Sequence, residues 1–224
     1  MLAQPAQSLT DLALGLVTVL LALRLSRTPA RHGNWRAAFF WFGVAALLGA
    51  VHHGVIVRWP RAADVSWGVV SVIVVVGVSY VLAGTVAEVL GPGRARAFWL
   101  LRSVGFLAYV GMVVSGHAGI AAILWCESLT MISVLVLWVW AAFHQNPMAP
   151  TALVAIAASL AAAGTKALSP DMLQTVRLDP TSCYHLAQIV GTVLLYVAVK
   201  RSLPADDSVQ KPFHHGTEQV RTPR

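Results

Sequence analysis

Charged side chains are scarce in this sequence of 224 residues. Asp, Glu, Lys and Arg together make up 11% of it, whereas 57% of the residues are hydrophobic. Soluble domains carry about 25% charged residues, so the composition excludes an ordinary soluble fold and fits a helical membrane protein with many spans. The net charge of +7 does not indicate nucleic-acid binding, because the basic residues are dispersed and not clustered with aromatic residues.

Several motifs that would assign a function are missing. Neither of the two cysteines, Cys126 and Cys183, lies in a C-x-x-C motif, which leaves a thioredoxin or zinc-ribbon fold without support. There is no G-x-S-x-G, no H-E-x-x-H and no phosphate-binding loop. No internal repeat is visible, which disfavours a transporter built from inverted repeats. The last apolar run has no lysine at mid-depth, where a retinal Schiff base would need one.

The sequence instead contains seven apolar runs of roughly 20 residues, the length that crosses a bilayer as a helix. Turn residues, mostly Pro and Gly, separate them. We therefore predict an all-α bundle of seven transmembrane helices over residues 1–203, and a disordered cytoplasmic tail over the polar residues 204–224. The predicted spans are Leu9–Leu25, Trp35–Val57, Trp67–Leu90, Phe98–Ser115, Ile120–Phe143, Thr151–Leu168 and Cys183–Val199.

The distribution of Lys and Arg predicts the orientation of the bundle. No basic residue precedes the first apolar run, so we expect that run to be a retained span and not a cleaved signal peptide. With the N-terminus outside, 12 of the 16 basic residues lie on the cytoplasmic side. The four on the other side are Arg58, Arg61, Lys166 and Arg177. The positive-inside rule therefore predicts a multi-pass protein of the cell inner (plasma) membrane, N-out and C-in.

Ionisable residues gather at the ends of the spans that share the non-cytoplasmic side. A charge at mid-helix costs about 2.5–3.5 kcal/mol on insertion scales, so such residues commonly serve a function. Together they predict one polar pocket that opens on that side. The residues are Asp11, His52, His53, Asp64, His117, Glu127, Lys166 and His185.

Within this set, imidazole and carboxylate groups from different helices suggest a zinc site. A catalytic zinc has three protein ligands and one position for water, and it makes hydroxide available near neutral pH. We predict His53, His185 and Glu127 as metal ligands, and Asp64 and Glu127 as catalytic residues. His52 is the control for His53. Adjacent helical residues point about 100° apart, so we expect His52 to point away from the pocket.

Two of the acidic residues also have simpler interpretations. Glu127 is a metal ligand, a general base or a proton-carrying acid, or else it forms a structural pair with Lys166. Asp11 follows Ser8 at the spacing of a helix-start motif, so it is as well explained by capping as by function. His117 is expected to lie only at the membrane interface.

The positions of His53, Asp64 and His185 resemble those of the superfamily of seven-span hydrolases that contains alkaline ceramidases and the adiponectin/progestin receptors. That superfamily has a span-two histidine, a span-three aspartate and an H-x-x-x-H pair in span seven, around a zinc ion. The resemblance implies the same N-out fold and lipid-hydrolase chemistry. The positions of that superfamily's span-two serine and second span-seven histidine are occupied in this chain by Gly49 and Ile189.

The chain resembles more closely an uncharacterised group of bacterial seven-span membrane proteins. The shared features are Thr10-Asp11 at the start, His53-Gly54 after span two and the Y-H-x-x-Q motif that begins at Tyr184.

The leading hypothesis is a zinc-dependent hydrolase that cleaves an amide or ester of a membrane lipid at the non-cytoplasmic face. The alternatives are a non-enzymatic membrane protein that binds a lipid or small molecule or is a subunit of a membrane complex, and a haem-binding electron carrier that uses two of His53, His117 and His185.

Overall fold

The computed structural model describes residues 1–27, 32–117, 120–167 and 179–201. All regular secondary structure in this part of the chain is helical. Six of its helices are long and apolar enough to cross a membrane, which is the architecture of a multi-pass membrane protein and confirms the all-α prediction. The predicted tail lies outside the described residues. The α-helices are α1 (Pro5–Leu25), α2 (Gly33–Gly54), α3 (Pro60–Val89), α4 (Ala95–Val114), α5 (Ile120–Phe143), α6 (Ala149–Gly164) and α8 (Pro180–Arg201).

Proline marks the beginning of three helices. Pro5, Pro60 and Pro180 are the first residues of α1, α3 and α8, where the missing proline N–H costs no hydrogen bond. Because of this, α1 and α3 begin earlier than the apolar runs at Leu9 and Trp67 predicted. The turn expected between α3 and α4 is confirmed by Gly91 and Gly93, which have φ values of 93° and 83°.

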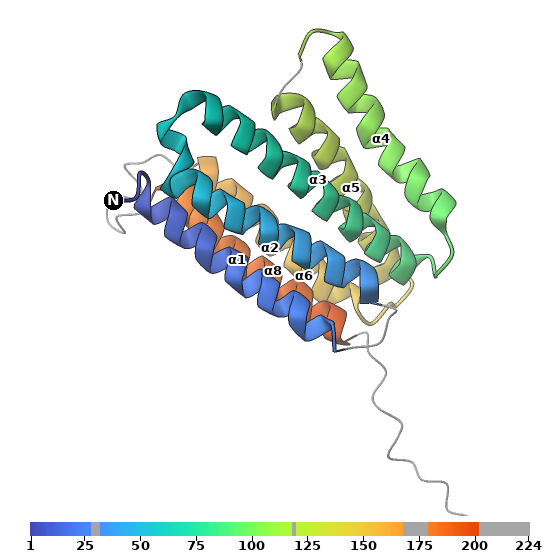
Figure 1. The fold of residues 1–224 in the computed structure, drawn as a ribbon. Helices are drawn as coiled ribbons and strands as arrows, with labels where there is room; N and C mark the ends of the chain where they lie inside the picture. The colour runs from blue at the N-terminus through green and yellow to red at the C-terminus, as the bar shows by residue number, and fades with distance from the viewer. Residues whose placement is uncertain (28–31, 118–119, 168–178, 202–224) are drawn as a thin grey trace, which may run out of the picture.

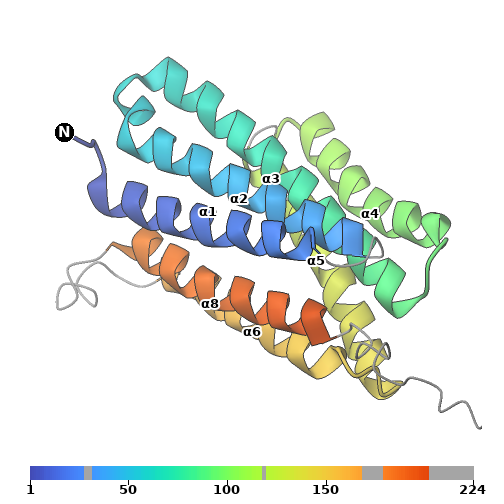
Figure 2. The ribbon, with the colours of Figure 1, turned by 60° about the horizontal axis from the view of Figure 1, so that its bottom comes forward.

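Six of the helices pack as a ring, in the order α1, α2, α3, α5, α6, α8 and back to α1. Figure 1 shows α1, α2 and α3 side by side, and Figure 2 shows α8 and α6 lying along the other side of α1. The N-terminal end of α1, the C-terminal end of α2 and the N-terminal ends of α3 and α8 lie at one end of this ring. The backbone N–H groups of Ala3 and Gln4 donate to Gly54 O and His53 O there.

Small residues bring α6 and α8 close together, as the composition of the sixth apolar run predicted. Ala149, Ala152, Ala155 and Ala162 are the buried residues of α6. A Cβ at Gly191 of α8 would collide with the Ser159 side chain. Such close backbone contact is how helices associate where lipid removes the hydrophobic driving force. With 16 residues, α6 is shorter than the other helices.

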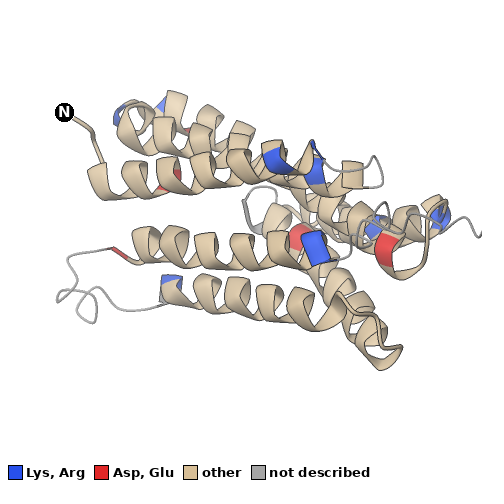
Figure 3. Ribbon diagram, turned by 90° about the horizontal axis from the view of Figure 1, so that it is seen from below, with Lys and Arg blue, Asp and Glu red and all other residues tan. Residues whose placement is uncertain are grey.

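Helix α4 lies outside the ring and packs mainly on α5 (Figure 1). Only Arg102 and Gly105 are buried along it, and large apolar side chains such as Leu100 and Leu107 are exposed. An apolar helix with so little protein cover is suited to a lipid environment. Charged residues occupy few places on the helical ribbon overall (Figure 3).

Candidate functional site

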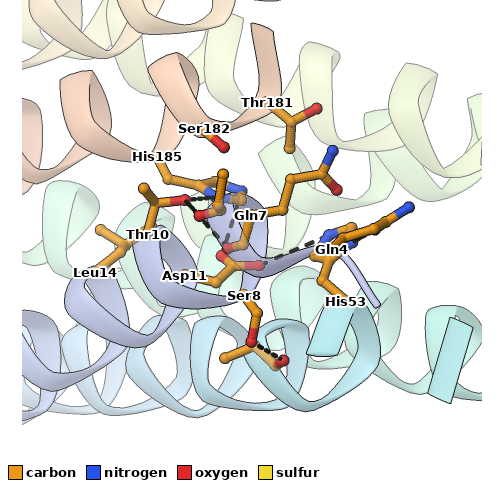
Figure 4. A network of polar contacts seen from close by, with 12 residues as sticks. Gln4, Gln7, Ser8, Thr10, Asp11, Leu14, His53, Thr181, Ser182 and His185 are labelled. Carbon is orange, nitrogen blue, oxygen red and sulfur yellow. Dashed lines mark hydrogen bonds and ion pairs between the residues drawn. The ribbon is translucent and has the colours of Figure 1, made fainter. Parts of the chain in front are cut away.

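The carboxylate of Asp11 lies between two histidines that come from different helices. Its Oδ1 is 3.3 Å from His185 Nε2, and its Oδ2 is 3.8 Å from His53 Nε2. Asp11 is on α1, His53 is in the last turn of α2 and His185 is in the second turn of α8. Figure 4 shows the three side chains together. The ring arrangement of helices therefore joins residues that are 174 positions apart in the chain into one polar cluster, which we call the Asp11 cluster.

The outer nitrogen of each histidine has a hydrogen-bond partner of its own. His53 Nδ1 is 2.6 Å from Gln4 Oε1, an amide oxygen that can only accept. His185 Nδ1 is 3.1 Å from Thr10 Oγ1, and the Thr10 hydroxyl is within reach of the carbonyl oxygens of Ala6 and Gln7. When the hydroxyl proton goes to a carbonyl, His185 Nδ1 donates to Thr10 Oγ1. In that arrangement both rings carry their proton on Nδ1 and leave Nε2 as an acceptor.

A glycine makes room for the carboxylate. A Cβ placed on Gly49 of α2 would lie 2.6 Å from Asp11 Oδ2, which is too close for any real side chain. Gly49 is the position one turn before His53. The space beside this glycine is thus filled by the carboxylate of α1.

The Asp11 cluster opens into a cavity of about 410 Å³, which we call the polar cavity. Its walls are mostly apolar and include Leu14, Phe42 and Val70, and its polar lining includes Lys166 and Gln188. The Lys166 ammonium lies 4.3 Å from the centre of the Tyr184 ring. This combination of apolar walls and a few converging polar groups is typical of a small-molecule site.

His52 behaves as the control that the helix geometry predicts. It is buried, its ring centre lies 5.3 Å from that of Trp67, and it does not line the polar cavity. Trp67 also contacts His53, with 6.1 Å between ring centres. Of the two adjacent histidines, His53 is the one that faces the cavity.

Two of the predicted site residues lie elsewhere. Asp64 is exposed in the second turn of α3, because that helix begins at Pro60 and places the aspartate on its outer face. Glu127 pairs with Arg102, whose Nη2 donates to Glu127 Oε1 at 2.9 Å. Neither residue lines the polar cavity. The prediction of one cluster containing His53, Asp64, Glu127 and His185 is therefore wrong for both acids, and so is the pairing of Glu127 with Lys166.

Asp11 is the acid for which the sequence left capping and function open. The helix-start pattern at Ser8 and Asp11 allowed a cap, but α1 begins at Pro5, so both residues lie inside the helix. Ser8 Oγ donates to Ala50 O at 2.8 Å and ties α1 to α2. Thr10 and Asp11 are adjacent in the chain, and both contact His185. This Thr-Asp pair is the sequence signal that identifies Asp11.

The comparison with protein families assigns the chain to one family. Residues 6–204 match the model of a family of unknown function, DUF6962. The chain belongs to this family. The match covers every helix described above, together with the three residues of the Asp11 cluster. No curated protein and no solved structure matches it.

The Asp11 cluster brings together three groups that can donate electron pairs. If both rings carry their proton on Nδ1, each neutral ring directs a lone pair on Nε2 toward the carboxylate, an arrangement in which a proton or a metal ion would relieve the repulsion between the three groups. Within the described residues, no group of three or more His, Cys, Asp or Glu side chains already has the geometry of a metal site. The ring centres of His53 and His185 are 6.3 Å apart, so one ion would draw the rings closer together.

Asp179 fixes the helix that carries His185. It accepts hydrogen bonds from the backbone N–H groups of Thr181 and Ser182, at 2.9 and 3.0 Å, and from Ser182 Oγ. Gln7 Nε2 of α1 donates to it as well, at 3.2 Å. Burial raises the pKa of the Asp179 carboxyl, but these hydrogen bonds outweigh it and hold that pKa below its usual value.

We expect the stability that Asp179 contributes to be lost in acid. A carboxyl whose pKa is lowered in the folded state stabilises the protein above its unfolded pKa of about 3.9, and this contribution disappears as the pH falls through the folded value. The difference in thermal unfolding temperature between Asp179→Asn and wild type in detergent should therefore be smaller at about pH 3.5 than at about pH 7. Asp179→Ala should lose about 0.5–2 kcal/mol at neutral pH. An equal loss at both pH values would contradict the role of the charge.

Proposed function

We propose that this DUF6962 protein is a membrane-embedded, metal-dependent hydrolase in which His53, His185 and Asp11 hold a zinc ion. Two imidazoles and one carboxylate are a ligand set of catalytic zinc sites. The assignment differs from the one that the sequence alone suggested, because Asp11 takes the place of Glu127 as the acidic ligand.

The observation that carries the proposal is the hydrogen bonding of the outer ring nitrogens. A histidine that binds a metal donates its other ring N–H to an acceptor, which fixes the tautomer and the orientation of the ring. Gln4 Oε1 and Thr10 Oγ1 are such acceptors, at 2.6 and 3.1 Å. A structural imidazole pair would not need both Nε2 atoms turned toward the same carboxylate.

The roles of the surrounding residues follow from their contacts. A bound zinc ion supplies a Lewis acid that activates water near neutral pH. Gln4 and Thr10 hold the two rings in place. The Lys166 ammonium, which lines the polar cavity, binds the oxygen that becomes negatively charged when an amide or ester is attacked. The apolar walls exclude bulk water and favour a substrate drawn from the membrane lipids.

The orientation proposed here places the Asp11 cluster on the non-cytoplasmic side of the cell inner membrane. It is supported by the positive-inside count and by the position of the cluster at the end of the ring where α1 begins. Single cysteines introduced at residues 169–178, ahead of α8, should react with a membrane-impermeant reagent on intact cells. Cysteines in the 27–33 loop should react only after permeabilisation. The reverse pattern would assign the site to the cytoplasm.

Metal analysis of the purified protein tests the hydrolase proposal. Protein prepared without chelators should contain about one zinc per chain, the stoichiometry of a single catalytic site. It should hydrolyse a lipid amide or ester, and this activity should disappear with the metal and return when zinc is added. A metal content below about a tenth of an equivalent would remove the proposal. An absorption spectrum on the same sample tests the haem alternative, which requires a Soret band.

A second candidate function is the non-enzymatic binding of an anionic small molecule or lipid headgroup. It is favoured by Lys166 at the polar cavity, and by the distances of the Asp11 cluster, 3.3 Å to His185 and 3.8 Å to His53, of which the second is longer than a metal-bridged pair needs. In this case Asp11 pairs directly with His185. Protein without metal that still binds an anionic amphipath would support this function.

A further inference from the structure

The polar cavity is elongated along the helices that form it. Lys166 and Thr181 line its outer end beside the Asp11 cluster, and Phe42 of α2 lines its inner end. Phe42 is about 16 Å from His53 along α2, at a rise of roughly 1.5 Å per residue. The cavity therefore continues well beyond the groups that would hold a metal ion. We call the part between the Asp11 cluster and Phe42 the apolar slot.

The lining of the apolar slot comes from helices on three sides. Leu14 is the next residue on the same face of α1 as the cluster carboxylate (Figure 4), and Ala46, Val70 and Val74 follow on α2 and α3. None of these four side chains is exposed. The apolar slot therefore lies inside the ring of helices and not on its lipid-facing surface.

The polar residues of the apolar slot are few. Thr18 Oγ1 donates to Leu14 O at 2.7 Å, and Gln188 Nε2 donates to Ser159 Oγ at 3.1 Å. Thr192 adds one further hydroxyl near the inner end. A polar group placed in the slot would lose its hydrogen bonds to water and find few in return, whereas an alkyl chain has none to lose. The lining therefore fits the apolar end of an amphipathic molecule.

The ring of Phe42 closes the inner end of the apolar slot. A Cβ placed on Gly77 of α3 would lie 2.9 Å from Phe42 Cε1, so the phenyl ring extends from α2 to the backbone of α3. A small cavity of about 60 Å³ lies beyond it, shares Phe42 and Thr192 with the slot, and is also lined by Ala38 and Leu195. The length of the slot is thus set by one side chain.

We propose that the apolar slot holds the acyl chain of a single-chain lipid amide or ester, with the carbonyl at the Asp11 cluster and the end of the chain at Phe42. The identity of the reacting group rests on the proposed hydrolase function. Water adds to the carbonyl, so the chain leaves as a fatty acid and the headgroup leaves as an amine or an alcohol. A slot inside the ring accommodates one chain, and Phe42 sets the longest chain that fits.

Binding to chelator-treated, full-length protein in nanodiscs tests the apolar slot without hydrolysis. A photoactivatable N-dodecanoyl ethanolamine should label residues of α1, α2, α3 or α8, and unlabelled octanoyl, dodecanoyl and palmitoyl ethanolamides should compete. Val74→Phe fills the slot about one turn before the level of Gly77 and Phe42. It should weaken competition by the palmitoyl compound about tenfold, the effect of overpacking an apolar space, and change that of the octanoyl compound by less than about twofold.

Val72→Phe is the matched control, because it makes the same change on α3 at an exposed residue outside the polar cavity. It should leave competition by every compound unchanged. Comparing each variant with wild type at one chain length cancels the partitioning of that compound into the membrane. Phe42→Ala should act in the opposite direction to Val74→Phe. It joins the slot to the small cavity beyond, so the preference should shift toward the palmitoyl compound.

Hydrolysis of the same compounds by zinc-loaded protein separates this proposal from the hydrolase proposal. If the chain-length shifts occur in binding but none of the compounds is cleaved, the slot stands and the proposed reaction fails. If cleavage occurs with the same chain-length profile in Val74→Phe, Phe42→Ala and wild type, the reaction stands and the slot is overturned. Absence of saturable labelling in wild type overturns it as well. Should one of the two slot variants fail to fold, the other decides.

Discussion

His185→Ala should lower the zinc content of the purified protein from about one equivalent to less than about a tenth. Removal of one of three protein ligands leaves too few donors to hold the ion in a catalytic site. His185 also loses its bond to Thr10 in this variant, so the measurement needs a folding control by size-exclusion chromatography. His117→Ala is the matched control, since the His117 side chain is exposed and, among the described residues, its ring hydrogen-bonds to Ser115 in its own turn. It should retain zinc.

The same measurement separates the two aspartates. Asp11→Asn should lose zinc as His185→Ala does, because an amide is a weak ligand, whereas Asp64→Asn should keep it because Asp64 is exposed on α3. Thr10→Val should weaken zinc binding about 10–100-fold, the range for residues that orient a ligand. Zinc loss in Asp64→Asn with retention in Asp11→Asn would contradict the assignment of Asp11 as the acidic ligand.

Breaking the Arg102–Glu127 pair should destabilise the protein by about 3–5 kcal/mol, the cost of leaving one buried charge without its partner. Arg102 is the main polar anchor of α4: besides Glu127 it bonds Thr130 Oγ1 at 2.6 Å. Arg102→Met should therefore show the loss in denaturant unfolding in detergent micelles. Arg96→Met, which changes an exposed arginine on the same helix, should stay within about 0.5 kcal/mol of wild type.

The double variant Arg102→Met with Glu127→Leu distinguishes charge from packing. Replacing both partners of a buried pair by apolar residues is often neutral or stabilising, so the double variant should recover most of the loss. Gly105 lets α4 approach α5 beside this pair, since a Cβ there would lie 2.6 Å from Cys126 O. If the double variant is as unstable as Arg102→Met alone, the helix contact depends on the shape of these side chains and not on their charges.

The fold was accessible from the sequence because length and apolarity alone specify membrane helices. Ile120–Phe143 coincides with α5, and the other spans differ from the observed helices at their ends. In α1, α3 and α8, a proline begins the helix before its apolar run. The order of the helices around the ring was not accessible. It depends on close contacts such as those of Gly49 and Gly191, whose partners are far away in the chain.

The sequence predicted the two histidines as site residues, but it left the role of their acidic partner Asp11 open. His53 and His185 interrupt apolar runs near the ends of helices, which makes them conspicuous. Asp11 matched a local capping pattern, and only the packing of α1 against both α2 and α8 brings it between the two rings. Glu127 is equally conspicuous, but its partner Arg102 was counted as a topogenic charge.

The contact between Gly49 and Asp11 has a consequence for how related sequences should vary. A Cβ at position 49 would meet the end of the Asp11 side chain, so a larger residue at position 49 requires the carboxylate at position 11 to move away or to be lost. Across homologous chains, we expect serine at the first position to accompany loss of the aspartate at the second, and glycine to accompany its presence. A search that requires the span-two serine would then discard chains of the second kind, although their acidic group is supplied from the first helix.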